Sequence, residues 1–199
     1  LRPELEAAGH RYQTRCDTET ILHAYEQYGT DCVLRLRGMF AFAIWDQSAQ
    51  TLFCSRDRLG KKPFYYYWDG RTFVFGSEIK AVLEHPAVPV ALEEAALPEY
   101  LGFGYLSGEQ TLFRGIRKLM PGHNLVLDLR NPSPNPHIEC YRDVPARASV
   151  SEQRSDAEWI SETRRRVEET VEMRLMSDVQ LGMFLTCGFG YRAIAALMK

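Results

Sequence analysis

Residues 64–75 have the sequence FYYYW-DG-RTFVF, and this stretch restricts the fold more than any other. Two aromatic, β-prone runs flank Asp69-Gly70, a dipeptide that supplies the positive φ values of a type I′ turn. We therefore predict an antiparallel hairpin in which 64–68 pairs with 71–75. Three consecutive tyrosines (65–67) could stack on a base, but strand propensity favours an aromatic hairpin packed on a core.

A second hairpin is predicted just before the first. The run MFAFAIW (39–45) has the composition of a strand buried on both faces, and TLFCS (51–55) is its predicted partner. HNLVLDL (123–129) is a further strand. Helices are predicted from Asp17 to a stop at Gly29, at 77–83 with Ser77 as cap, and within 92–103. The first 130 residues are thus predicted to form an α+β domain of layered antiparallel sheets with helices outside.

The segment NPSPNPH (131–137) contains three prolines and can continue neither a strand nor a helix. Ser155 with Glu158 forms a capping box, and apolar positions then recur every four residues, which predicts an amphipathic helix. VQLGMFL (179–185) is typical of a parallel-sheet strand and leads through a glycine-bearing turn into a second helix. We predict a domain over 1–130, a linker over 131–154 and the start of an α/β domain over 155–199.

Composition excludes several classes of protein. A net charge of −2 without long runs of one sign gives no reason to expect nucleic acid as a partner. No apolar stretch approaches the roughly 20 residues that a membrane span needs. Five unpatterned cysteines argue against a disulfide framework or zinc site, and favour a reducing, cytoplasmic compartment. The first residue is Leu1 and both ends fall within helical patterns, so we expect a fragment.

Six stretches of the chain, most of them longer than ten residues, carry a resemblance to a known family. They are GHRYQTRCDTETILHAYEQYG, RLRGMFAFAIWD, LFCSRDRLGKKPFYYY, FGSEIKAVLEHP, TLFRGIRKLMPGH and MSDVQLGMFL. In this order the chain resembles the glutamine-hydrolysing asparagine synthetases. The resemblance covers nearly the whole chain. It implies a class II glutamine amidotransferase domain of the N-terminal-nucleophile type without its N-terminus, followed by the first β–α unit of an ATP-pyrophosphatase domain.

The resemblance assigns a substrate contact to Asp17. In the family, a carboxylate in an S-D-x-E segment grips the α-ammonium of glutamine, and the matching segment here is Cys16-Asp17-Thr18-Glu19. A fixed carboxylate recognises an ammonium by a charge-assisted hydrogen bond. The residues alone favour a plainer role, in which Asp17 caps a helix that begins at Thr18. The resemblance reverses that preference, and the two roles are compatible.

The family's nucleophile is an N-terminal cysteine with its own α-amine as base, and Leu1 lies after the segment that would carry it. We therefore assign no catalytic residue and expect no glutaminase activity from the chain as given. Cys54, in an apolar strand, is interpreted as core packing. The charges of RDRLGKKP (56–63) are interpreted as a surface loop whose charges pair with each other, rather than as an anion site. No histidine has metal-ligand spacing, so we assign the histidines no chemistry.

The turn at the end of the chain differs from its family counterpart. In the family, a strand runs into S-G-G-x-D-S, whose backbone N–H groups and hydroxyls hold the pyrophosphate of ATP and whose aspartate is linked to magnesium. Thr186 keeps a hydroxyl and Gly188 a bare backbone, but Gly190 replaces the aspartate. The implied but degenerate ATP-binding set is Leu185, Thr186, Cys187, Gly188, Gly190, Tyr191 and Arg192. No residue of this chain is assigned to a metal.

The resemblance implies a whole enzyme that hydrolyses glutamine, channels ammonia and uses ATP to adenylate aspartate, giving asparagine, AMP and pyrophosphate. The acceptor could equally be a related carboxylate, because the acceptor pocket is expected beyond Lys199. The implied ligands are glutamine, aspartate or a related carboxylate, ATP and Mg²⁺. The resemblance is also compatible with a homodimer. The alternative is a non-catalytic relic or regulatory module that keeps only the fold.

Overall fold

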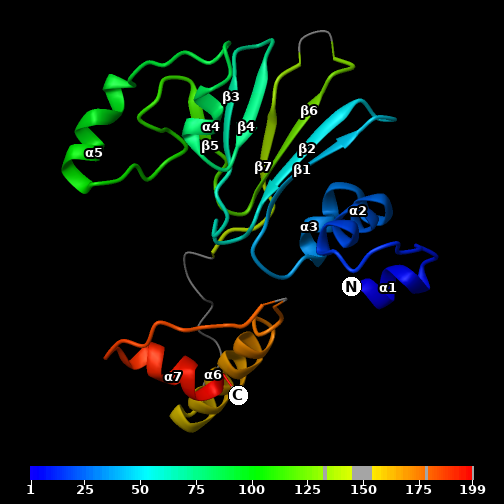
Figure 1. Ribbon diagram of the computed structural model, residues 1–199, viewed down its shortest axis with the longest axis vertical. Coiled ribbons are helices and arrows are strands. Elements are labelled where there is room, and N and C mark those ends of the chain that lie inside the picture. Colours follow the sequence, from blue (N-terminus) through cyan, green and yellow to red (C-terminus); the bar gives the residue numbers. More distant parts are fainter. Residues whose placement is uncertain (132–133, 145–153, 178, 199) are drawn as a thin grey trace. The chain divides into compact units, whose positions relative to one another are not determined.

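The structure is a computed structural model that describes residues 1–131, 134–144, 154–177 and 179–198. The chain divides into two compact units, Leu1–Val144 and Pro145–Lys199. Each unit has its own helices, and all strands formed by the described residues belong to the first (Figure 1).

The first unit contains a four-stranded antiparallel sheet. Its order is β1-β2-β6-β7, formed by β1 (Ala41–Asp46), β2 (Thr51–Arg56), β6 (His123–Asp128) and β7 (His137–Cys140). The predicted pairing of 39–45 with 51–55 is confirmed, with Ile44 opposite Phe53. β1 lies at the edge of the sheet, and Ile44 is its one buried residue. Side chains of β1 nevertheless contact apolar clusters on both faces of the sheet.

A second antiparallel sheet has the order β4-β3-β5, formed by β3 (Tyr65–Trp68), β4 (Phe73–Gly76) and β5 (Ile116–Lys118). The predicted aromatic hairpin is confirmed, with Trp68 opposite Phe73. The predicted type I′ turn is wrong, because only Gly70 of the Asp69-Gly70 pair has a positive φ (92°). The loop is longer, and the Asp69 carboxylate closes it by accepting the backbone N–H groups of Arg71 (2.9 Å) and Thr72 (2.7 Å).

Helices cover the outer faces of the stacked sheets. α1 (Arg2–Ala7), α2 (Asp17–Tyr28), the 3₁₀ turn η1 (Gly29–Asp31) and α3 (Cys32–Arg35) lie on the four-stranded sheet. α4 (Ile79–Leu83) packs on the other sheet, and η2 (Glu94–Ala96) leads into α5 (Leu97–Phe103). Figure 1 shows this sequence of layers, which confirms the predicted α+β architecture. The predicted Ser77 cap is wrong, since Glu78 occupies the N-cap position of α4 and makes no side-chain capping bond.

Alternation along the strands creates three apolar clusters: one on the outer face of each sheet and one between the two sheets. Neighbouring residues of a strand point to opposite faces. Phe53 therefore joins the cluster under α1–α3, whereas Cys54 joins the cluster between the two sheets. In the same way Tyr66 faces the other sheet and Tyr67 faces α4. The tyrosine run is thus part of the core, as the sequence predicted.

The first unit extends past the proline-rich segment. β7 pairs with β6 after the prolines, so the unit ends at Val144 rather than near residue 130. Tyr141 and Arg142 then donate backbone hydrogen bonds to the carbonyl of Gly122. Gly122 has a φ of +67°, and a Cβ there would lie 2.0 Å from the carbonyl oxygen of Arg142, so this closure requires glycine. Of the predicted linker, residues 132–133 and 145–153 lie outside the described residues.

The second unit contains α6 (Asp156–Glu172) and α7 (Phe189–Leu197). The predicted capping box is confirmed, with reciprocal bonds between Ser155 and Glu158. The predicted strand at 179–185 is wrong: these residues form no regular secondary structure and are mostly exposed, and no described residue of the unit forms a strand beside them. A parallel-sheet strand needs such neighbours to satisfy its backbone. No helix within the described ranges is long and apolar enough to cross a membrane.

Candidate functional site: a groove at the start of the second helix

Asp17 is the first residue of α2 and lies on the edge of a groove of about 290 Å³. The N-cap position is taken by Cys16, and no side-chain capping bond is made there. The interpretation of Asp17 as the helix cap is therefore wrong. Its exposed carboxylate has the favourable position for an anion at a helix N-terminus. The groove is lined by Asp17, Thr18, Ile21, Leu22, Met39, Phe40, Ala41, Phe42, Ala43, Ile44, Lys62, Pro63 and Ser77.

Glu19 fixes the turn that precedes Asp17. Its carboxylate accepts backbone hydrogen bonds from Gln13 (2.6 Å) and Thr14 (2.7 Å), and a further one from the Thr14 hydroxyl. The Gln13 N–H and the Thr14 hydroxyl chiefly lower the pKa of Glu19 to about 2, because they bind its charged form. Glu19 therefore holds the chain in place immediately before Asp17.

Lys62 reaches the groove from the loop after β2, which the Asp57 carboxylate organises. Asp57 is buried and accepts backbone hydrogen bonds from Leu59 (3.1 Å), Lys61 (3.0 Å) and Lys62 (2.9 Å). These bonds keep the loop closed and set the course of the backbone at Lys62.

The two arginines of this loop also bind backbone groups. Arg56 donates to the carbonyls of Lys62 (2.8 Å), Gly60 (2.8 Å) and Leu119 (2.6 Å), and Arg58 donates to that of Leu36 (2.6 Å). The expectation that the charges of 56–63 pair with each other is therefore wrong, since Arg56, Asp57 and Arg58 tie the backbone together.

The cysteines offer no nucleophile in this groove. All five are free, which agrees with the absence of a disulfide framework. Cys54 is fully buried, and burial raises the pKa of its thiol to about 12. Such a thiol is inert as a nucleophile, which supports its interpretation as a core residue.

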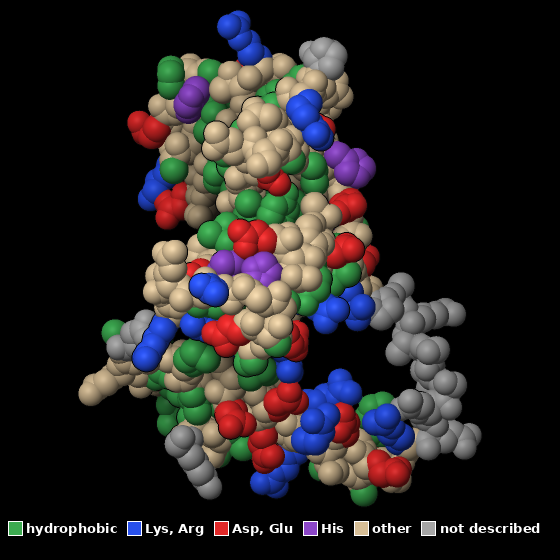
Figure 2. Space-filling view, turned by 90° about the vertical axis from the view of Figure 1, so that its right-hand side faces the viewer, with side chains coloured by type: hydrophobic (Ala, Val, Ile, Leu, Met, Phe, Trp, Pro, Cys, Tyr) green, Lys and Arg blue, Asp and Glu red, His purple; other side chains and the backbone are tan. Residues whose placement is uncertain are grey.

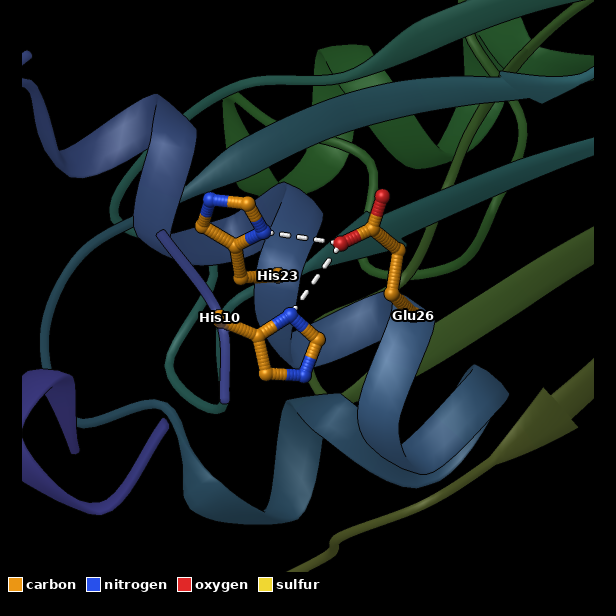
Figure 3. Close-up of side chains that lie close together, drawn as sticks. All are labelled: His10, His23 and Glu26. Atoms are coloured by element: carbon orange, nitrogen blue, oxygen red, sulfur yellow. Dashed lines mark hydrogen bonds and ion pairs between the residues drawn. The ribbon is translucent and has the colours of Figure 1, made fainter. Parts of the chain in front are cut away.

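Three residues that the sequence left without a role lie together on the helical face of the first unit. His10, from the segment after α1, and His23, on α2, both direct ring nitrogens at the Glu26 carboxylate (Figure 3). The distances from His10 Nδ1 and His23 Nδ1 to Glu26 Oε2 are 3.3 Å and 2.7 Å. These two histidines, to which the sequence assigned no chemistry, therefore lie together in the fold. Their spacing in sequence gave no signal, because the turn at 8–16 brings them together.

The loop 185–192 does not have the chemistry of a pyrophosphate site. All of Leu185, Thr186, Cys187, Gly188, Gly190, Tyr191 and Arg192 are exposed. The Tyr191 ring occupies the space beside the Gly188 backbone, where a Cβ would meet it at 3.3 Å. The first turn of α7 carries no acidic residue that could be linked to Mg²⁺. ATP and magnesium are therefore a poor match for this loop, and we derive no step through them.

Sequence reasoning missed Lys62 and Ser77 as groove residues. Both lie in stretches that carried the family resemblance, but only the packing of distant segments places them on the same groove as Asp17.

Comparison with known proteins places the groove in a family. The model of the glutamine amidotransferase domain matches residues 1–137. Asparagine synthetase [glutamine-hydrolyzing] 3 of Bacillus subtilis is 38% identical over 99% of this chain and 31% of its own length. Asparagine synthetase [glutamine-hydrolyzing] 1 of the same organism is 30% identical over 100% of this chain and 30% of its own. A solved glutamine phosphoribosylpyrophosphate amidotransferase from B. subtilis aligns over 90% of this chain and 36% of its own, with 18% identity and a TM-score of 0.47.

The chain thus spans about a third of the length of these curated relatives. The family model covers β1 to β6 and the first residue of β7, as well as α1 to α5 and the whole Asp17 groove. This chain belongs to the glutamine amidotransferase domain family, and nearly its whole length is similar to the glutamine-hydrolysing asparagine synthetases.

Proposed function

We propose that this chain forms the glutamine-binding part of a glutamine-dependent amidotransferase, in which Asp17 holds the α-ammonium group of the substrate. The observation that carries the proposal is the position of Asp17, an exposed carboxylate at the edge of a groove in a glutamine amidotransferase domain. A carboxylate held by a helix start and by the neighbouring Glu19 turn is pre-organised for such a charge-assisted bond.

The rest of the groove supports an amino-acid ligand. Lys62 provides a positive charge for the substrate α-carboxylate, and the Ser77 hydroxyl can donate or accept a hydrogen bond. Leu22 and Met39 line the same groove and are 46% and 50% exposed. They offer apolar surface to the methylene groups of glutamine. A groove with one carboxylate, one ammonium and an apolar floor is complementary to a zwitterion with a short aliphatic side chain.

Release of ammonia needs a nucleophile besides these groups. In the resembled enzymes this is an N-terminal cysteine, and no cysteine lies among the residues that line the groove of this chain. We therefore assign substrate recognition, and not bond cleavage, to the groove residues.

The second half of the family reaction is a proposal for the whole enzyme only. There, ATP with Mg²⁺ would activate aspartate or a related carboxylate for amidation by ammonia. The exposed loop at 185–192, with Tyr191 beside Gly188, does not support a contribution of this chain to ATP binding. The cytoplasmic location and a homodimer likewise remain predictions.

The proposal is tested by glutamine kinetics in the protein that the complete gene encodes. Ammonia release should follow glutamine concentration, and Asp17→Asn should lower kcat/KM for glutamine at least tenfold, the effect of losing roughly 1.5 kcal/mol or more of charged hydrogen bonding. Asp31→Asn, an exposed carboxylate outside the groove, is the matched control and should leave the kinetics unchanged. Unchanged kinetics for Asp17→Asn, or no glutamine-dependent ammonia, would refute the proposal.

A further inference from the structure

The His10–His23–Glu26 cluster converges three metal-ligating atoms from two segments of the first unit. His23 and Glu26 lie one turn apart on α2, and His10 comes from the segment between α1 and α2. One ligand atom of each residue lies within 4.8 Å of the other two. Figure 3 shows both rings turned towards the same carboxylate oxygen.

His10 has a polar partner on each side of its ring. Its Nε2 lies 3.0 Å from Gln27 Oε1, and its Nδ1 faces Glu26 Oε2 at 3.3 Å. When Nε2–H donates to the Gln27 side chain, Nδ1 presents a lone pair towards the Glu26 carboxylate, so that a cation between the two would bind both.

His23 has the same orientation towards Glu26. Its Nδ1 lies 2.7 Å from Glu26 Oε2. Its Nε2 is buried without a hydrogen-bond partner, and Glu19 Oε1 is 3.7 Å away. Histidines that bind metals commonly donate their second ring N–H to a carboxylate or carbonyl, which fixes the ring and raises its basicity as a ligand. The Gln27 side-chain oxygen has this position beside His10, whereas His23 Nε2 makes no hydrogen bond.

The cluster is accessible to an ion from solvent. The Glu26 side chain is 60% exposed, whereas the two imidazoles are only 16% and 17% exposed. The ring centroids of the histidines are 5.0 Å apart. Figure 2 shows that histidine side chains reach the surface of the molecule beside acidic groups. The imidazoles are held by packing, and the carboxylate is free to adjust.

We propose that His10 and His23, through their Nδ1 atoms, and Glu26, through a carboxylate oxygen, bind one divalent first-row transition-metal ion of the zinc type. Two imidazoles and a carboxylate suit such ions better than the hard cations Mg²⁺ and Ca²⁺, which prefer oxygen ligands. Metal bonds of about 2.0–2.1 Å in tetrahedral geometry separate ligand atoms by about 3.3 Å. The distance from His10 Nδ1 to Glu26 Oε2 already has this value. The distance from His23 Nδ1 to Glu26 Oε2 is shorter, at 2.7 Å, and a rotation of the exposed Glu26 side chain would lengthen it.

The bound ion would act as a clamp. It would join the segment after α1 to the middle of α2, and this segment leads directly into the turn held by Glu19 before Asp17. Because the ion binds the folded arrangement of these residues, it should stabilise the first unit in proportion to its concentration. Water completes the coordination, since the protein provides three ligands.

The test is zinc binding by calorimetry after treatment with a chelator. The exposed thiols are first removed by Cys16→Ser, Cys140→Ser and Cys187→Ser, because thiolates also bind zinc. We expect one zinc ion per chain and a rise in Tm on adding zinc. His10→Asn and Glu26→Gln should each weaken binding at least tenfold. His137→Asn, an exposed histidine on β7, should leave it unchanged.

The proposal also has a readout that does not depend on affinity. Cobalt bound in place of zinc should show visible bands of a nitrogen- and oxygen-ligated ion without thiolate charge transfer, and His23→Asn should abolish them. Far-UV circular dichroism establishes that each variant is folded. Absence of stoichiometric zinc binding, or equal binding by the wild-type side chains and Glu26→Gln, would overturn the proposal.

Discussion

The two units of this chain differ in how they cover their apolar residues. In the first, three clusters separated by two sheets bury residues such as Phe53, Ile116 and Leu125 almost completely. In the second, Val171 is the one buried apolar residue among those described, whereas Phe184 and Phe189 are 93% and 83% exposed. An open apolar cleft of about 570 Å³ lies between α6 and α7.

The difference shows what a β-strand requires. Residues 41–46 and 179–185 are both largely apolar, but among the described residues only the first run has a neighbouring strand in its unit. β1 is an edge strand and nevertheless forms, because β2 pairs with it through a short turn. The run at 179–185 forms no strand, because strand geometry without a neighbour leaves its backbone groups unpaired.

The largest expected effect comes from matched truncations in the two units. Phe53→Ala should destabilise the first unit by about 3–5 kcal/mol, because it removes a fully buried ring that stacks on Tyr25 and meets Phe42 edge-on. Phe184→Ala in the second unit should change stability by less than about 0.5 kcal/mol. Urea unfolding followed by circular dichroism measures both. Similar losses for the two variants would remove the basis of the comparison.

A smaller loss is expected for the buried carboxylate of the groove loop. Asp57→Asn replaces one acceptor oxygen by an amide NH₂, which then faces either the Lys62 N–H or the N–H groups of Leu59 and Lys61. Leaving such buried donors unpaired costs about 1–3 kcal/mol. Asp31→Asn, which is exposed, serves as the control in the same urea experiment. A cost below that of the control would mean that the loop does not depend on Asp57.

The terminal loop provides a gain-of-function test of the second unit. As written, this chain should show no saturable binding of ATP–Mg²⁺ in calorimetry. In the protein that the complete gene encodes, restoring the family loop should create or strengthen binding at least tenfold. The changes are Thr186→Ser, Cys187→Gly, Phe189→Leu, Gly190→Asp, Tyr191→Ser and Arg192→Ser. Equally tight binding before and after restoration would show that Arg192 and the start of α7 suffice.

The smallest effect separates two carboxylates with equally low pKa values, one in each unit. The pKa of Glu19 is lowered to about 2 mainly by the Gln13 backbone, and that of Glu162 to about 2 by hydrogen bonds from Arg165 and Arg166. Salt screens exposed ion pairs. High salt should therefore raise the pKa of Glu162 more than that of Glu19, and NMR titration at low and high salt measures both values.

The sign of the pH dependence follows from the lowered pKa of Glu19. Its folded-state pKa lies below the unfolded value near 4.3. Its contribution to stability is therefore present above about pH 4.3 and is lost as the pH falls towards 2. The difference in unfolding midpoint between wild type and Glu19→Gln should accordingly shrink over this range. A difference that grows on acidification would contradict the assignment.

Features set by neighbours in sequence were predictable. The hairpin around Asp69-Gly70 and the capping box of Ser155 with Glu158 depend on a few adjacent residues, and both are present. The details of the turn were not predictable, because the Asp69 carboxylate competes with the backbone geometry that Asp-Gly pairs favour. Local signals thus specified which elements form but not how each one closes.

Features set by distant contacts could not be predicted. The prolines before β7 hid a strand whose partner β6 precedes them, and nothing local marks that pairing. Asp57 resembled a surface charge until its backbone partners were known. The same holds for the candidate sites. Asp17 was found through a family resemblance, but Lys62 and the His10–His23 pair required the fold to bring them into place.

The central claim is that Asp17 recognises the α-ammonium of glutamine, and affinity for two ligands tests it most directly. L-glutamine is compared with glutaramate, which is glutamine without its α-amino group, in the protein that the complete gene encodes. We predict that Asp17→Asn weakens glutamine binding by roughly 1.5–3 kcal/mol and leaves glutaramate binding unchanged, while Asp31→Asn affects neither. An equal loss for both ligands, or no loss for glutamine, would contradict the account.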